Sequence, residues 1–90
     1  MVFEMTITRE ELLRLLPAAL GPGLEAEGDG FLRKEAGRSL RIALAALPPL
    51  ALGTINLDRL RVELTFQGYS GEAREAVLEQ FRRTTQRGGG

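Results

Sequence analysis

The chain of 90 residues contains no cysteine, no histidine and no tryptophan. Without cysteine it forms no disulfide and no reactive thiolate, and without cysteine or histidine it lacks the usual ligands of a zinc site. Without histidine it also lacks the side chain that most often acts as a general base near neutral pH. We therefore expect a protein that is not an enzyme, with no catalytic residue, no cofactor and no metal.

An excess of charge is also lacking, because 12 lysines and arginines balance 12 aspartates and glutamates. No overall field draws the chain to nucleic acid, which is not an expected partner. No segment is long and apolar enough to predict a transmembrane helix, and the N-terminal residues do not follow the pattern of a secretory signal. These features predict a cytoplasmic protein.

The composition and length are those of one small globular domain. Hydrophobic residues make up 43% of the chain and charged residues 27%, a balance typical of a folded domain. The low-complexity stretch is confined to the three glycines at the C-terminus. We therefore predict a single α+β domain over residues 1–87 and a flexible glycine tail over residues 88–90.

Two helices are indicated, one near each end of the domain. Thr8 and Glu11 fit the capping box that begins a helix, and the Leu-rich residues that follow form an apolar stripe. Pro17 predicts a kink or an end to this first helix. The second helix is expected from Gly71 to about Arg83 or slightly beyond, with Ser70 as its N-cap.

Between and before these helices, alternating apolar and polar residues predict strands separated by tight, glycine-containing turns. The expected strands cover residues 3–7, 24–27, 31–35, 39–46 and 59–67. Strands joined by tight turns pair antiparallel. The sequence therefore predicts a two-layer α+β sandwich, with an antiparallel sheet of about four to five strands and both helices on one face, in the order β-α-β-β-β-β-α.

The two longest expected strands can be placed in register. Pairing Leu44 with Leu60 keeps the apolar side chains of both strands on one face, and it sets Arg41 opposite Glu63. A register shifted by two residues also keeps the apolar side chains on one face, so that alternative stays open.

This register places several arginines on the outer face of the sheet, namely Arg41, Arg59 and Arg61, with Arg33 as a candidate fourth. Sheets that bind RNA combine such cations with stacking aromatic residues. No aromatic residue falls on this face, so we interpret the arginines as ordinary solvated charge.

The least ordinary segment is the apolar connection between these two strands, which has no charged residue between Arg41 and Asp58. Connections are usually polar. Two interpretations stay open: the connection folds over the core as a loop or short extra strand, or it forms an exposed apolar contact surface. In the second case the partner-binding residues are Leu47, Leu50, Leu52, Ile55 and Leu57.

The chain ends in Gly88, Gly89 and Gly90. Such an end resembles that of ubiquitin-like modifiers and of the small sulfur carriers of thiamine and molybdopterin synthesis, and the resemblance implies a tail that enters an adenylating enzyme.

Three functions follow from these features. Our first expectation is an accessory domain that binds a protein partner or forms a homodimer through the apolar connection. The alternatives are a module that binds an apolar ligand or a membrane surface through the same segment, and a sulfur carrier that uses its glycine end.

Overall fold

A computed structural model describes residues 1–89, with side chains described for residues 1–86. The elements in chain order are β1 (Val2–Met5), α1 (Arg9–Leu20), β2 (Glu25–Glu27), β3 (Gly30–Glu35), β4 (Arg38–Leu52), β5 (Ile55–Gln67) and α2 (Gly71–Gly89). This order confirms the predicted β-α-β-β-β-β-α arrangement and the α+β class.

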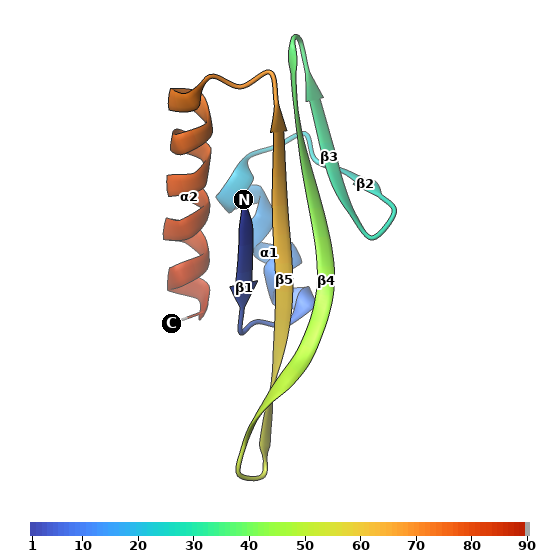
Figure 1. Ribbon diagram of the computed structural model, residues 1–90, viewed down its shortest axis with the longest axis vertical. Helices are drawn as coiled ribbons and strands as arrows, with labels where there is room; N and C mark the ends of the chain where they lie inside the picture. Colours follow the sequence, from blue (N-terminus) through green and yellow to red (C-terminus); the bar gives the residue numbers. More distant parts are fainter. Residues whose placement is uncertain (90) are drawn as a thin grey trace.

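The five strands form one open antiparallel sheet in the order β1-β5-β4-β3-β2 (Figure 1). Both helices pack against the same face of this sheet, and α1 lies behind it in Figure 1. We call the helix-free face the outer face. The molecule measures 49 × 26 × 19 Å, and its long axis follows β4 and β5, which extend well beyond both helices (Figure 1).

The core lies between the helices and the inner face of the sheet. Its largest fully buried side chain is Phe81 of α2, whose ring centroid lies 5.0 Å from that of Phe3 on β1. The other buried apolar residues are Ile7, Leu12, Leu16, Ala19, Leu20, Leu40, Ile42, Leu44, Leu60, Val62, Leu64 and Leu78. The apolar stripes of α1, β4, β5 and α2 thus meet in one shared core.

Both helices begin as the sequence predicts. The Thr8 hydroxyl accepts a hydrogen bond from the Glu11 backbone N–H at 3.1 Å, and the Ser70 hydroxyl accepts one from Ala73 at 3.1 Å. Pro17 does not end α1, which continues to Leu20, where the chain buries further apolar surface.

The helix α2 ends at Gly89, later than the predicted end near Arg83. The expected flexible tail over residues 88–90 includes Gly90, which lies outside the described residues, so that expectation stays a prediction.

The predicted register between β4 and β5 is wrong by two residues. Leu44 pairs with Val62 rather than Leu60, and Arg41 lies opposite Thr65 rather than Glu63. The alternation of apolar residues is the same in both registers, so it could not distinguish them. The register is set by two features together: Leu52 and Ile55 close a two-residue hairpin, and an irregularity between Leu47 and Leu50 shifts the pairing by one residue.

Candidate functional site

The apolar connection is a hairpin arm, which we define as residues 47–57, and it projects from one end of the molecule (Figure 1). Its two central turn residues are Gly53 and Thr54. Gly53 has a φ of 61°, and glycine at the first central position is typical of a tight type II′ hairpin turn. The connection is thus extended strand, as the first interpretation allowed, but it continues β4 and β5 as a paired hairpin and is not a loop over the core.

A β-bulge interrupts the ladder where the arm begins. Leu47 pairs with Arg59 and Leu50 with Leu57, so that two prolines on β4 stand opposite one residue on β5. Proline has no backbone N–H to donate, which explains why the ladder breaks at this point. The bulge shifts the alternation of β4 by one residue.

This shift places all five predicted partner-binding residues on one face. Leu47 lies on the outer face with its pair Arg59, and the bulge brings Leu50 and Leu52 to that same face beyond it. Their cross-strand neighbours Leu57 and Ile55 share this face too. The arm therefore carries its aliphatic side chains on the side opposite to the helices.

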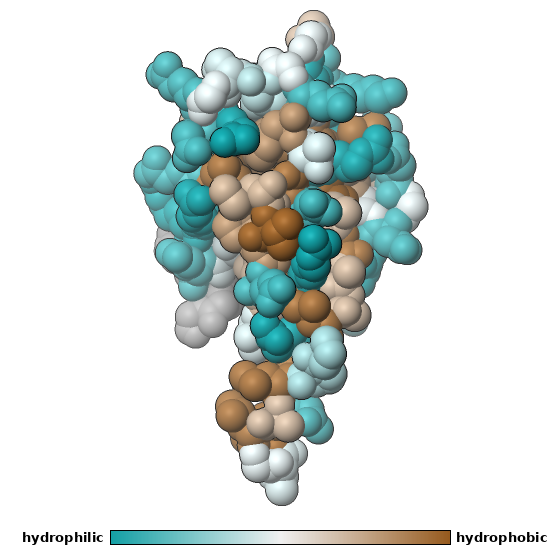
Figure 2. Space-filling view, in the orientation of Figure 1, coloured by the Kyte–Doolittle hydropathy of each residue, from teal (hydrophilic) through white to brown (hydrophobic). Residues whose placement is uncertain are grey.

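This patch is largely exposed. Leu50, Leu52 and Ile55 are 42%, 55% and 59% exposed, and Leu47 and Leu57 are half-buried. The space-filling view shows the arm as a brown, apolar projection below a body that carries many teal, hydrophilic side chains (Figure 2). Ala51 and Asn56, which pair with each other, lie on the opposite face of the arm, so its apolar character is one-sided.

The outer face of the body differs in character, because its arginines are paired with carboxylates. Arg59 lies 3.4 Å from Glu4 and Arg61 lies 3.7 Å from Glu63, while Arg41 contacts Glu27. These pairs support the interpretation of the arginines as solvated charge, and they leave little local field for a polyanion.

The placement of Arg33 on this face was wrong. Arg33 pairs with Leu40 and lies on the helix side of the sheet. Its guanidinium donates hydrogen bonds to the backbone carbonyls of Leu20 and Pro22, the latter at 3.2 Å. A cation at the C-terminal end of a helix satisfies carbonyls that have no partner within it, so Arg33 fixes the end of α1.

Arg33 also belongs to a small polar cluster at the edge of the inner face. Its Nε lies 3.2 Å from a Glu35 carboxylate oxygen, and Arg38 lies 3.3 Å from the other oxygen. The Tyr69 hydroxyl donates to Glu35 at 3.3 Å, and the Arg38 guanidinium lies 4.4 Å from the Tyr69 ring centre. The hydrogen bond from Arg38, with the charges of both arginines, lowers the pKa of Glu35. These contacts tie β3, β4 and the start of α2 together.

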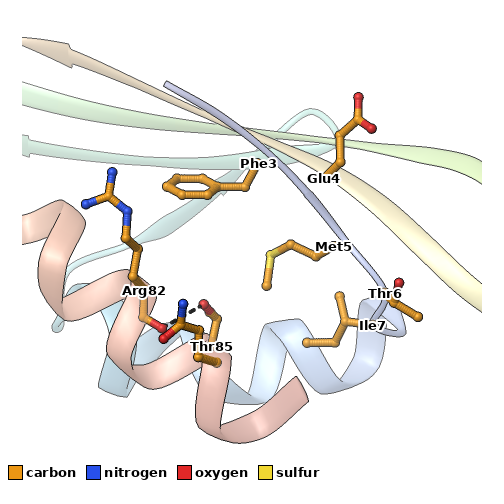
Figure 3. Close-up of a pocket in the computed structure, with 8 residues that line it drawn as sticks. Phe3, Glu4, Met5, Thr6, Ile7, Arg82 and Thr85 are labelled. Carbon is orange, nitrogen blue, oxygen red and sulfur yellow. Dashed lines mark hydrogen bonds between the residues drawn. The ribbon is translucent and has the colours of Figure 1, made fainter. Parts of the chain in front are cut away.

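A groove of about 450 Å³ lies between β1 and the C-terminal half of α2 (Figure 3). Phe3, Met5 and Ile7 line its strand side, while Arg82 and Thr85 approach from the helix. In Figure 3 these side chains point toward a common space, whereas Glu4 points away from it. No sequence pattern predicts this groove. The alternation of residues 3–7 predicts only the strand beside it, which in the structure ends at Met5.

Among residues 1–89, no group of three or more acidic side chains is placed to hold a metal ion. Within the same range, no helix combines the length and the apolar character needed to cross a membrane. The features that stand out are therefore surfaces, the hairpin arm and the groove.

No protein-family model matches this chain, no curated protein is significantly similar to it, and no solved structure matches its fold significantly.

Proposed function

We propose that this protein is a non-enzymatic interaction domain that docks onto a protein partner through the one-sided apolar face of its hairpin arm. The observation that carries this proposal is the gathering of Leu47, Leu50, Leu52, Ile55 and Leu57 on one uncovered face. A two-stranded ribbon is marginally stable in water by itself. Exposed aliphatic side chains on such a ribbon gain free energy when a partner buries them.

The chemistry of the arm favours a protein over a lipid bilayer. A hairpin immersed in lipid meets hydrocarbon on both faces, but Asn56 lies on the second face of the arm. The arginines nearest the arm, Arg59 and Arg61, are already paired with carboxylates, so they add little attraction for anionic headgroups.

The size of the patch favours a different protein over a second copy of this chain. Burying one such side chain contributes about 1.5–3 kcal/mol, at about 25 cal/mol for each Å² of apolar surface. Five side chains therefore offer roughly 300–600 Å² of apolar surface to a partner. A stable interface needs about 800 Å² from each partner. Two flat patches placed face to face fall short of this area, whereas a groove that encloses the arm contacts its second face and its edges as well.

Site-specific photo-crosslinking tests this proposal. A photoreactive amino acid at position 55, on the apolar face, should form a crosslink in the producing cells to one protein of defined mass. The same group at position 56, on the opposite face, should form little of that product. Adding Leu52→Asp to the position-55 protein should abolish the crosslink, while adding Ala51→Asp should retain most of it.

The masses of the products separate the candidate partners. A product at twice the mass of the chain identifies a homodimer, and sedimentation of the purified protein checks it. Co-sedimentation of the purified protein with anionic vesicles, abolished by Leu52→Asp, would instead identify a membrane surface. Equal crosslinking from positions 55 and 56 would contradict docking through the apolar face.

The sulfur-carrier alternative has no support in the described structure. The glycines that suggested it include Gly90, which lies outside the described residues, and the residues before them form the helix α2. Incubation with ATP and an adenylating enzyme of sulfur transfer, followed by mass spectrometry of the C-terminus, tests it directly.

A further inference from the structure

We propose that the groove between β1 and α2 is a second binding site, which takes an extended acidic peptide as a sixth strand of the sheet. This site is separate from the hairpin arm. Three features support it: the edge position of β1, the shape of the groove and the charge at its rim.

β1 is an edge strand whose outward backbone groups can be assigned. Met1 and Leu64 form a mutual hydrogen-bonded pair. The Leu64 nitrogen lies 2.8 Å from the Met1 carbonyl oxygen, and the Met1 nitrogen lies 3.0 Å from the Leu64 carbonyl oxygen. Hydrogen-bonded and non-hydrogen-bonded pairs alternate along an antiparallel ladder. Phe3 and Met5 therefore direct their N–H and C=O groups to β5, whereas Val2 and Glu4 direct theirs to the open edge.

The groove lies beside this edge and suits the side chains of an added strand. Alternate side chains of that strand would point to the inner face, where they meet Phe3, Met5 and Ile7. Phe3 and Met5 are partly buried, and Ile7 forms part of the core. Backbone hydrogen bonds to an edge strand, combined with a pocket for alternate side chains, are the basis of peptide recognition by strand addition.

A positive charge at the rim of the groove indicates that the bound peptide is acidic. Arg82 reaches up from α2 beside the Phe3 ring, with its guanidinium carbon 5.8 Å from the ring centre (Figure 3). Among the described side chains, Arg82 has no carboxylate within ion-pair distance, whereas its neighbour Arg83 is paired with Glu79 at 2.8 Å. The carboxylate of Glu4 points away from the groove. A carboxylate on the incoming strand therefore complements the site.

The experiment begins with selection of a displayed library of random seven-residue peptides on the full chain. The selected sequences should alternate apolar residues and contain Asp or Glu at a fixed position. On binding of a synthetic selected peptide, NMR amide shifts should concentrate in residues 2–7 and around Arg82. Failure to select any peptide, or shifts confined to the arm, would overturn the proposal.

Two pairs of variants then test the backbone and the charge separately. Glu4→Pro removes an outward N–H without breaking the ladder to β5, whereas Glu4→Ala keeps that N–H. The affinity of the Glu4→Pro variant for the peptide should therefore be about 10-fold lower than that of Glu4→Ala. Thermal melting checks that both variants fold. Equal affinities of the two folded variants would exclude strand addition.

For the charge, replacing the acidic residue of the peptide with lysine should weaken binding to the wild-type chain about five-fold at low salt. Arg82→Gln should remove this preference, whereas Arg83→Gln should retain it. If the Arg82→Gln variant still preferred the acidic peptide over the lysine-containing one, Arg82 would not be the residue that recognises the acidic side chain. Leu52→Asp should bind the peptide as the wild type does, which distinguishes this site from the arm.

Discussion

The strands β4 and β5 pass through two regions that share a secondary structure but differ in what surrounds them. In the body, Leu44 and Val62 face two helices and are buried. In the hairpin arm, Leu52 and Ile55 pair in the same way, yet more than half of each side chain is exposed. An apolar alternating strand therefore predicts a buried face only where another layer is available to cover it.

The bulge sharpens this difference, because it changes which face is apolar. Before the bulge, the buried residues Leu40, Ile42 and Leu44 of β4 lie on the helix side. Beyond it, Leu50 and Leu52 lie on the outer face. A regular ladder would have directed Leu50 and Leu52 to the same side as the helices. The prolines thus separate a strand segment that builds the core from one that presents a surface.

The largest effect is expected for Phe81 in the body, which is fully buried between α2 and the sheet. Phe81→Ala should lower the free energy of unfolding by about 3–5 kcal/mol, because it removes the largest core side chain and leaves a cavity. Urea unfolding measures this change. An unchanged midpoint would show that α2 does not anchor the core.

A charge placed in the body tests the same region in another way. Leu44 is 8% exposed on β4, so Leu44→Asp buries a carboxylate without a partner. The variant should lose about 2 kcal/mol or more of its stability, which thermal melting detects as a large drop in Tm. A melting temperature within about 1 °C of the wild type would contradict the burial of this strand face.

How far the sequence predicts this molecule depends on the kind of information each feature requires. The capping residues Thr8 and Ser70 act on neighbours in the chain, so local patterns were enough to locate both helix starts. The position of Arg33 was mistaken because its partners, Leu20 and Pro22, are distant in sequence. A pattern of alternating residues gives the two faces of a strand, but it does not state which face the helices cover.

The candidate sites show the same division. The uncharged run in the sequence was enough to predict the five arm residues. The bulge that gathers them on one face could not be predicted from the two adjacent prolines, because it depends on the pairing of the two strands. The groove beside β1 depends on a strand at one end of the chain lying beside a helix at the other. Such proximity follows from the topology rather than from any local motif.

A smaller effect is expected from Glu35, which lies where β3, β4 and the start of α2 meet. Its pKa is lowered below the usual 4.5, mainly by the hydrogen bond from Arg38. A carboxylate with a lowered folded-state pKa stabilises the fold above the unfolded-state pKa, and this contribution is lost as the pH falls through the folded-state value.

The variant Glu35→Gln lacks that pH-dependent contribution. Its Tm should therefore lie below that of the wild type at about pH 7, and the two should converge as the pH falls below about 4.5 and through the lowered folded-state pKa of Glu35. Glu25→Gln on β2 is the matched control for the loss of one glutamate charge elsewhere on the sheet. A constant difference between the Glu35→Gln and wild-type melting temperatures would contradict the lowered pKa.

The smallest effect on folding is expected in the arm, where the same chemical change as at Leu44 meets solvent. Leu52 is 55% exposed, so the carboxylate of Leu52→Asp stays hydrated and should alter the free energy of unfolding by no more than about 0.5 kcal/mol. Thermal melting of Leu52→Asp and Leu44→Asp side by side measures the contrast within one strand. If the two variants lost similar stability, the arm would be packed against the body in solution, and its apolar face would not be free to meet a partner.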